Sequence, residues 1–358
     1  MKGHLCSANF GVNRHSQPSH EAAQKPAPRL SIVIPTLNEE AHIRKCLTAL
    51  ADTLPSSVPF EVLIIDNGST DRTLDIALSF DDILDLKLHQ KLFSSISSLR
   101  NLGASFARAG ILVFLDADCI APRDWIDRLA TAFSTEVGTS IIGSRYRAPE
   151  CSTWVARAWE RGQDGIVRRS VAYIPGGTMA MRMSVFHKLG GFDPTLVTNE
   201  DAELCRRARA AAVEVIADPG LAVVHLGTSQ TLKTFYRRQF WHGTHVTKVF
   251  LRAPFKSGNE KALLMAAYSL IMQFSIAAST FYYVSTGNFL RVTCALALLS
   301  APAVYLACVR VVSTRAWRDV PALFALYFLY GLARSHCLVR QLITRKASGT
   351  DVTPDANA

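Results

Sequence analysis

The sequence predicts an α/β domain with a mostly parallel, Rossmann-like sheet, followed by C-terminal α-helical membrane segments. Two observations support this fold class. From residue 30 to about 228, short apolar runs rich in β-branched residues alternate with segments of helical spacing, as in a sheet with crossover helices. From about residue 262 onward the chain is far more hydrophobic, and one stretch of more than twenty residues carries no charge.

Strands and helices alternate in the first half of the domain. The expected strands are "LSIVIP" (30–35), "FEVLIID" (60–66), "LKLHQ" (86–90) and "ILVFLDAD" (111–118). The expected helices are "EEAHIRKCLTALAD" (39–52), "STDRTLDIALSF" (69–80) and "SSLRNLGASFARAG" (97–110). Ser69 or Thr70 is the expected N-cap of the second helix, and the third helix is expected to end at Gly110.

The second half of the domain is expected to add a strand and the start of a helix in "GGTMAMRMSVF" (176–186). A helix over "EDAELCRRARAA" (200–211) has acidic residues in its first turn, and "VEVIAD" (213–218) and "AVVHLG" (222–227) are expected strands. The predicted organisation is a disordered tail (1–28), the α/β domain (29–230), a basic amphipathic interfacial segment (231–258), a membrane region (259–345) and a disordered tail (346–358).

Composition leaves several partners open. The 358 residues carry a formal net charge of +10, which suits nucleic acid, anionic lipid or phosphate-bearing substrates. The basic, aromatic stretch 232–256 lies directly before a hydrophobic segment, which favours a membrane surface over nucleic acid. Eight cysteines without a C-x-x-C pair argue against a zinc ribbon or a disulfide framework, and indicate reduced thiols in a cytosol-facing protein.

Three C-terminal segments compete as membrane spans. The stretch 262–288 is long enough to cross a bilayer, 292–309 is near the lower limit, and 320–333 is only about 14 residues long before Arg334. Basic residues at 310–318 place that loop and the N-terminal domain in the cytoplasm. Because the basic C-terminal tail also belongs there, we expect a multi-pass cell-membrane protein with two spans and an interfacial or re-entrant third helix. Three spans are the alternative.

Polar clusters stand at the ends of three predicted strands: "PTLNEE" (35–40), "DNGSTD" (66–71) and "DADC" (116–119). The carboxyl ends of parallel strands line one crevice, where ligands bind. Asp116 and Asp118 can aim carboxylate oxygens at Mg²⁺ or Mn²⁺, which would neutralise a diphosphate. The acidic pair in "NED" (199–201) either caps a helix or accepts a proton from an attacking hydroxyl.

Five segments together resemble a family 2 glycosyltransferase with the nucleotide-sugar-binding GT-A fold. They are "SIVIPTLNEEAHIRKCLTAL", "VLIIDNGSTDRT", "RNLGASFARAGILVFLDADCIAPRDWI", "GGFDPTL" and "NEDAEL", in the family's order, within residues 30–228. The resemblance implies an inverting enzyme that uses a nucleoside diphosphate sugar, with Mg²⁺ or Mn²⁺ as cofactor. Its acceptor would be a lipid-linked saccharide or glycolipid at the membrane, in cell-envelope or exopolysaccharide synthesis, with no nucleic acid as partner.

The resemblance also implies roles for residues. On the donor side it implies Pro35, Thr36, Asn38, Glu39, Asp66, Asn67, Ser69, Arg100, Asn101, Asp116, Ala117 and Asp118. Gly176 and Gly177 would form an acceptor-side turn, Asp201 would be the catalytic base and Glu200 its neighbour. Asp118 is the expected direct metal ligand, with Asp116 and His225 as further candidates. Asn67 replaces the family's usual second acidic residue, which leaves the base open among uracil, thymine and guanine.

Two other kinds of protein fit parts of the sequence. A non-catalytic membrane subunit could bind nucleotide sugar within a glycan assembly complex, but such a protein is expected to have lost one of Asp116, Asp118 and Asp201. A nucleotidyltransferase would share the sheet and the metal. It normally needs a glycine-rich, basic loop after its first strand, where this chain has "PTLNEE".

Overall fold

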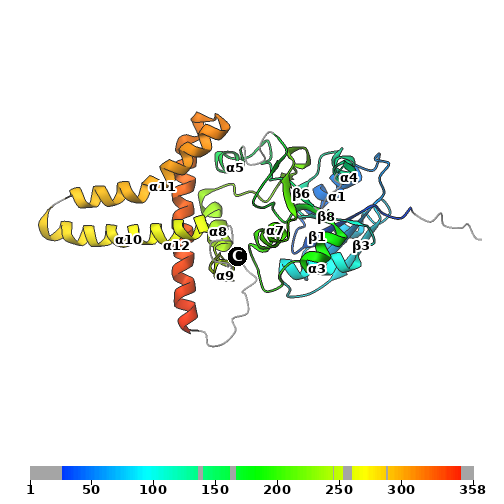
Figure 1. Ribbon diagram of the computed structural model, residues 1–358, viewed down its shortest axis with the longest axis horizontal. Helices are drawn as coiled ribbons and strands as arrows, with labels where there is room; N and C mark the ends of the chain where they lie inside the picture. Colours follow the sequence, from blue (N-terminus) through cyan, green and yellow to red (C-terminus); the bar gives the residue numbers. More distant parts are fainter. Residues whose placement is uncertain are drawn as a thin grey trace, which may run out of the picture.

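The computed structural model describes residues 26–135, 140–161, 167–244, 246–252, 260–287 and 289–347. The expected tails at 1–28 and 346–358 lie outside this range, except for 26–28 and 346–347. An N-terminal α/β domain is joined to a group of C-terminal helices, two of which project away from it as a hairpin (Figure 1).

The domain is built on a mostly parallel sheet with the order β3-β2-β1-β4-β8-β6-β9-β7. Strands β3, β2, β1 and β4 are parallel, and β8 is antiparallel to both β4 and β6. The strands are β1 (Leu30–Thr36), β2 (Phe60–Asp66), β3 (Leu86–Gln90), β4 (Ile111–Leu115), β6 (Ser140–Gly143), β7 (Arg169–Ser170), β8 (Thr178–Arg182) and β9 (Glu214–Ala217). A small second sheet pairs β5 (Cys119–Ile120) with β10 (Val224–His225).

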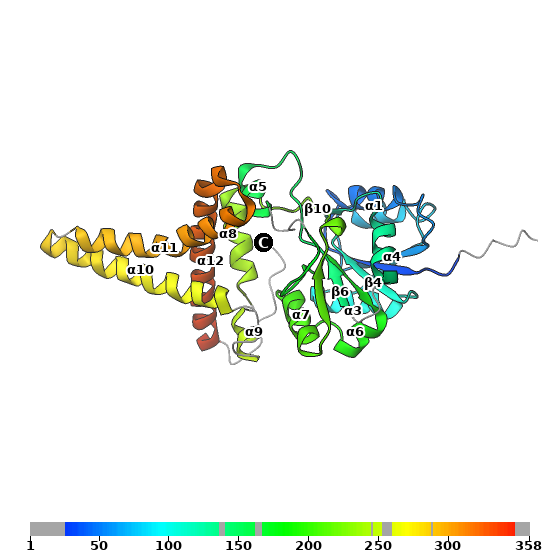
Figure 2. The ribbon, with the colours of Figure 1, turned by 45° about the horizontal axis from the view of Figure 1, so that its top comes forward.

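Helices cover both faces of the large sheet (Figure 2). On one face lie α1 (Ile43–Ala51), α2 (Thr73–Leu78) and α4 (Trp125–Thr135); on the other lie α3 (Ile96–Phe106), α6 (Met183–Leu189) and α7 (Glu200–Ala210). Every residue of β1 and β2 is buried, which explains why these strands read as continuous apolar runs. The polar exceptions are paired: Ser31 Oγ donates to Glu61 Oε1 (2.6 Å), and Arg108 Nε donates to Glu61 Oε2 (2.7 Å).

Several predicted boundaries need correction. Helix α2 begins at Thr73, and its N-cap is Arg72 with no side-chain cap, so Ser69 and Thr70 do not cap it. The Ser69 hydroxyl instead donates to Asp66 Oδ1 (2.5 Å), and Asp71 accepts from the Thr73 backbone amide (3.0 Å). Helix α3 ends at Phe106 rather than Gly110. Strand β4 stops at Leu115, so Asp116 and Asp118 lie in the loop after it.

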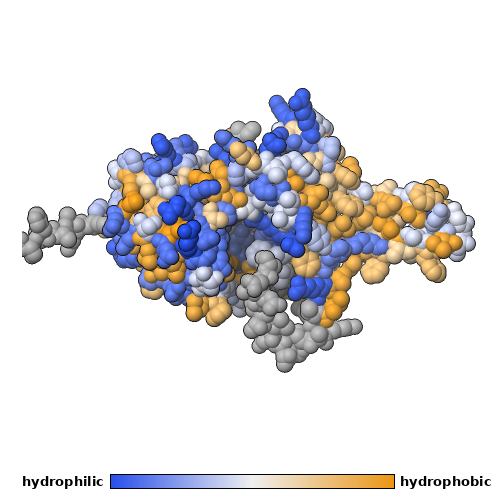
Figure 3. All heavy atoms as spheres, turned by 180° about the vertical axis from the view of Figure 1, so that it is seen from behind, coloured by the Kyte–Doolittle hydropathy of each residue, from blue (hydrophilic) through white to orange (hydrophobic). Residues whose placement is uncertain are grey.

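The C-terminal part is helical. It contains α8 (Leu232–His242), α9 (Val246–Arg252), α10 (Glu260–Thr286), α11 (Leu290–Thr314) and α12 (Val320–Ala347). Helix α5 (Trp154–Glu160) of the α/β domain contacts α12. Apolar residues cover the projecting α10–α11 hairpin (Figure 3). The third segment is not a short helix of about 14 residues, because α12 continues past Arg334 to Ala347. Three helices are thus long and apolar enough to cross a membrane, which is consistent with membrane anchoring.

Candidate active site

The loops after β1 and β2 are joined by hydrogen bonds between predicted donor-side residues. Thr36 Oγ1 donates to Asp66 Oδ1 (3.2 Å), and Asp66 Oδ2 accepts from the backbone amides of Gly68 (2.8 Å) and Ser69 (3.0 Å). Burial acts to raise the pKa of Asp66, but these hydrogen bonds to its charged form lower it below its ordinary value. Asp66 is therefore an ionised anchor of the loop.

Asn38 holds the same two loops together from the other side. Its backbone adopts a left-handed conformation (φ +54°), its amide donates to Ser69 Oγ (2.9 Å), and its side-chain oxygen accepts from the Thr70 amide (2.9 Å). Glu39 Oε2 lies 3.1 Å from His42 Nδ1. Pro35 is buried within β1, opposite Ile65 of β2, so it shapes the strand end.

The side-chain amides of Asn67 and Asn101 each donate one hydrogen bond to, and accept one from, the backbone of a single residue. Asn67 Nδ2 donates to the Ser94 carbonyl (3.1 Å), and Asn67 Oδ1 accepts from the Ser94 amide (2.8 Å). Asn101 makes the same pair of bonds to Phe192 (2.8 and 2.9 Å). Asn101 therefore positions the 191–193 turn, and Asn67 holds the loop after β3.

Arg100 connects the two acidic groups that the sequence singled out. Its buried guanidinium donates through Nη2 to Asp116 Oδ1 (2.9 Å) and through Nη1 to Glu200 Oε1 (2.7 Å). Burial acts to lower the pKa of Arg100, but Asp116 and Glu200 raise it above its ordinary value. The loop after β4 and the start of α7 are thus held together by one cation.

Asp116 is held by one side chain at each of its carboxylate oxygens. Its Oδ1 accepts from Arg100, and its Oδ2 accepts from the Tyr146 hydroxyl (2.8 Å). Burial acts to raise the pKa of Asp116, but the nearby Arg100 lowers it below its ordinary value. Ala117, another predicted donor-side residue, is 3% exposed and belongs to the core under β4.

Asp118 and His225 form the group best suited to a divalent cation. His225 Nε2 lies 3.2 Å from Asp118 Oδ2, and ligand atoms of Asp118, Cys119 and His225 all lie within 4.8 Å of one another. The pairing of β10 with β5 brings His225 here, opposite Cys119. Burial lowers the pKa of His225, so its ring is neutral and can donate a lone pair.

The residues fit a hard or borderline cation such as Mg²⁺ or Mn²⁺. His225 Nδ1 is buried and has no hydrogen-bond partner among the residues the structure describes. Burial raises the pKa of Cys119 well above its ordinary value, which keeps the thiol protonated and makes it a poor ligand. A carboxylate and an imidazole remain, and a diphosphate could supply the other oxygens.

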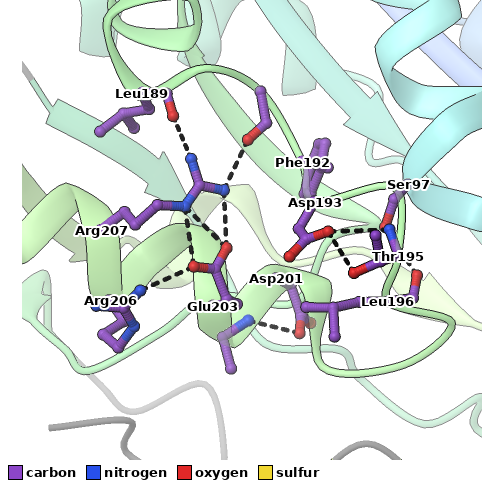
Figure 4. A network of polar contacts seen from close by, with 12 residues as sticks. Ser97, Leu189, Phe192, Asp193, Thr195, Leu196, Asp201, Glu203, Arg206 and Arg207 are labelled. Atoms are coloured by element: carbon purple, nitrogen blue, oxygen red, sulfur yellow. Dashed lines mark hydrogen bonds and ion pairs between the residues drawn. The ribbon is translucent and has the colours of Figure 1, made fainter. Parts of the chain in front are cut away.

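Glu200 and Asp201 begin helix α7. Asp201 Oδ1 accepts from the Ala202 amide (2.7 Å), as Figure 4 shows. Its Oδ2 accepts from the Gly176 amide (3.2 Å). Burial raises the pKa of Asp201, and burial together with Asp201 raises the pKa of Glu200 to about 7. Both carboxylates therefore accept protons more readily than exposed ones.

A second ion network fixes the direction of α7. Glu203 accepts from Arg206 (2.9 Å) and from Arg207 Nε (2.8 Å), and Arg207 Nη2 donates to the Gly191 carbonyl (2.7 Å) (Figure 4). Arg207 also donates to the Leu189 carbonyl. The first turn of α7 is thus tied to the turn after α6, which fixes where Glu200 and Asp201 lie.

Gly176 and Gly177 lie directly against the acidic groups. A Cβ atom on Gly176 would meet Arg100 Nη1 at 2.4 Å, and one on Gly177 would meet Asp116 Oδ2 at 2.0 Å. Gly227 makes the same kind of approach to Asp118, where a Cβ would lie 2.1 Å from Oδ2. These glycines leave room for the charged side chains.

Sequence reasoning missed Tyr146, Gly227 and Asn199. Tyr146 comes from an irregular loop after β6, and nothing in its surrounding sequence predicts its bond to Asp116. Gly227 follows "VVHL" and could have been suspected as a close-approach glycine beside His225. Asn199 has a left-handed backbone (φ +63°), and its Nδ2 donates to the His242 carbonyl at the end of α8 (3.0 Å).

Residues 31–190 match the family described as Glycosyl transferase family 2. The chain therefore carries a glycosyltransferase family 2 domain with a GT-A-like fold.

Named relatives and a solved structure agree with this family. The chain is 31% identical over 194 residues to Glycosyltransferase AglE of Haloferax volcanii. The match covers 51% of this chain and 62% of AglE, so the chain spans less than two thirds of the length of AglE. It is 29% identical over 248 residues to Succinoglycan biosynthesis protein ExoA of Rhizobium meliloti (66% and 74% covered). The mannosyltransferase PcManGT from Pyrobaculum calidifontis, solved with GDP-Man and Mn²⁺, shares the fold at TM-score 0.58 and 19% identity, covering 89% of this chain and 88% of its own.

Proposed function

We propose that the protein is a metal-dependent, inverting glycosyltransferase. It would move a sugar from a nucleoside diphosphate sugar to a membrane-associated acceptor, such as a lipid-linked saccharide or glycolipid. The observation that carries this proposal is the Arg100 bridge, 2.9 Å to Asp116 and 2.7 Å to Glu200. It brings the D-x-D segment and the acidic start of α7 into one site, as transfer to a hydroxyl requires.

The metal would be held by Asp118 and His225. Mg²⁺ or Mn²⁺ bound there supplies positive charge that stabilises the departing diphosphate. PcManGT, which shares the fold and was solved in complex with GDP-Man and Mn²⁺, supports this class of cofactor and donor. Asp116, whose oxygens are used by Arg100 and Tyr146, would position the loop that carries Asp118.

Asp201 would be the catalytic base. The acceptor hydroxyl oxygen forms a bond to the anomeric carbon of the sugar while the bond from that carbon to the diphosphate oxygen breaks. The hydroxyl proton passes to Asp201, whose raised pKa suits a proton acceptor. Because the acceptor attacks opposite the leaving group, the anomeric configuration inverts.

Arg100 would keep the two acidic groups at fixed distance and in their charged forms. Without a cation between them, two buried carboxylates would favour protonation. Glu200 would hold Arg100 in place next to the base rather than take the proton itself. Arg100 and Glu200 are thus positioning residues for Asp118 and Asp201.

The acceptor class rests on the C-terminal helices. Three candidate spans are consistent with a domain next to a bilayer, and ExoA, a relative, is named for succinoglycan biosynthesis. Arg310, Arg315 and Arg318 lie at or just after the end of α11, and the positive-inside rule then favours a cytoplasmic catalytic domain. We propose cell-envelope or exopolysaccharide synthesis on this basis.

The test is donor binding and turnover by the purified full-length chain with Mn²⁺, across a panel of UDP, GDP and dTDP sugars. The proposal expects one donor to bind and to be slowly hydrolysed or transferred, and EDTA to abolish turnover. Binding without any turnover on membrane extracts would instead identify a non-catalytic nucleotide-sugar-binding subunit. Binding of none of these donors would contradict the proposed donor class.

A further inference from the structure

Helix α12 differs from α10 and α11 in what it contacts. Both views show α12 running crosswise to the α10–α11 hairpin, between the hairpin and the domain (Figures 1 and 2). The Tyr236 hydroxyl of α8 lies 2.6 Å from His336 Nδ1, and Arg334 Nη2 donates to Gln239 Oε1 of α8 (3.3 Å). Gln341 Nε2 donates to the Gly243 carbonyl just after α8 (2.9 Å).

The first half of α12 also packs on the domain. Trp159 of α5 lies 5.5 Å, between ring centroids, from Tyr327, and Phe235 of α8 packs with Leu323 and Leu326 in one buried cluster. Just before α12, Asp319 forms an ion pair with Arg161 (3.0 Å). Helix α5 of the domain and helix α8, which follows the domain, therefore contact α12 from its first turn to Gln341.

If α12 crossed the bilayer, α5 and α8, which contact it, would have to enter the membrane as well. Helix α8 carries Lys233, Arg237 and Arg238 on the 11 residues beside α12. Arginine and lysine are strongly disfavoured in the hydrocarbon core unless they reach its edge. Among the described residues of the projecting part of α10, exposed side chains such as Phe274 and Phe281 are apolar.

The lengths of the helices leave room for α12 at the near membrane surface. Gln273 of α10 bonds to Ser335 and His336 of α12, so the two helices cross in the domain-proximal half of α10. The 13 residues from 274 to 286 then project about 20 Å past the crossing at 1.5 Å per residue. An interfacial α12 would sink about 5–10 Å into the boundary of headgroups and acyl chains, so the hairpin would reach about 25–30 Å from that surface, close to the ~30 Å thickness of the hydrocarbon core.

We propose that α12 lies in the plane of the cytoplasmic membrane surface, as an interfacial helix, and that only the α10–α11 hairpin crosses the bilayer. Trp317, three residues before α12, and Leu342 and Ile343, near its end, expose apolar surface that suits the headgroup boundary. The partner of this surface is the lipid bilayer itself. This placement does not depend on the proposed transfer reaction.

The in-plane helix would also fix the active site relative to the lipid. Helix α8, which rests on α12, touches both halves of the site. The Asn199 side chain beside Glu200 donates to the His242 carbonyl (3.0 Å), and Arg238 Nη1 donates to the Gly227 carbonyl (2.5 Å), next to Asp118. The candidate active site would thus sit close to the headgroups, where a lipid-linked acceptor presents its hydroxyl.

The test adds one cysteine at a time to the full-length chain in sealed membrane vesicles. Cys6, Cys151, Cys294 and the partly exposed Cys308 are first replaced by serine, which leaves four buried cysteines, and Trp317→Cys, Leu342→Cys and Phe289→Cys are made one at a time. A membrane-impermeant maleimide is added from either side, and detergent-solubilised samples give the full reactivity of each cysteine. Phe289, 56% exposed at the hairpin tip, is the matched control for the far side.

The proposal expects the cysteines at 317 and 342 to react from the domain side, and the cysteine at 289 to react only from the opposite side. Reaction of the cysteine at 342 from the same side as 289 would show a third span and overturn the proposal. Labelling at 342 only in detergent would place α12 inside the hydrocarbon, and labelling at 289 from the domain side would show that the hairpin does not cross. Either result would also overturn it.

Discussion

Removal of the Arg100 charge tests how the two acidic halves of the site are held. Arg100 is 3% exposed and lies within 2.9 Å of both Asp116 and Glu200. Arg100→Gln keeps a polar side chain but leaves both carboxylates without their cation. Breaking a buried ion pair costs about 3–5 kcal/mol, and a domain of this size loses about 2–4 °C of melting temperature per kcal/mol. We therefore expect the melting temperature to fall by about 6–20 °C.

Thermal unfolding of the detergent-solubilised protein measures this change, with Arg128→Gln as the matched control. Arg128 forms an ion pair of 2.6 Å with Asp124 on the surface, where both side chains are about half exposed. Such a pair contributes at most about 1 kcal/mol, so the control should lose less than about 4 °C. If Arg100→Gln melted no lower than Arg128→Gln, the bridge would not hold the site together, and the reasoning would be refuted.

Three further predictions concern the reacting groups. His225→Ala should raise the Mn²⁺ concentration for half-maximal turnover by more than about tenfold, since even residues that only hydrogen-bond to metal ligands change metal affinity by about 10–100-fold. An unchanged Mn²⁺ titration would count against His225 as a ligand. Asn199→Gly keeps the left-handed backbone but loses the hydrogen bond to the His242 carbonyl, which is worth about 1 kcal/mol. Turnover should therefore fall about fivefold with donor affinity unchanged. Equal turnover would show that α8 does not help to position the base. Because burial raises the pKa of Asp201 above its ordinary value, the base takes up a proton, and kcat/KM is lost, at a higher pH than for an exposed aspartate. A profile that stays flat down to the ordinary pKa of an aspartate would contradict this.

Much of the α/β domain follows from local sequence patterns. The strands β1 and β2 begin and end within one residue of their apolar runs, because a strand buried on both faces is apolar nearly throughout. The carboxyl ends of β1, β2 and β4 meet at one edge of the sheet, so the polar clusters that follow them could be placed together before the structure was known.

The side-chain partners could not be read from the sequence. Asn67 and Asn101 look like ligand contacts in a linear pattern, yet both bond to backbone groups 27 and 91 residues away. Asp116, one of the candidate metal ligands, is held by Arg100 and Tyr146, and Tyr146 comes from a loop without a pattern. The length of α12 was underestimated because Arg334 interrupts its apolar run, while its partner Gln239 lies 95 residues earlier.

The most direct test of the proposed reaction is Asp201→Asn, compared with the wild-type chain at saturating donor and Mn²⁺. The asparagine keeps the size of the side chain and can still accept from the Gly176 amide, so donor binding should be unchanged. Without a base, transfer to the acceptor should fall by about 10²–10⁴-fold. Undiminished turnover in this variant would contradict the assignment of Asp201 and the proposed mechanism with it.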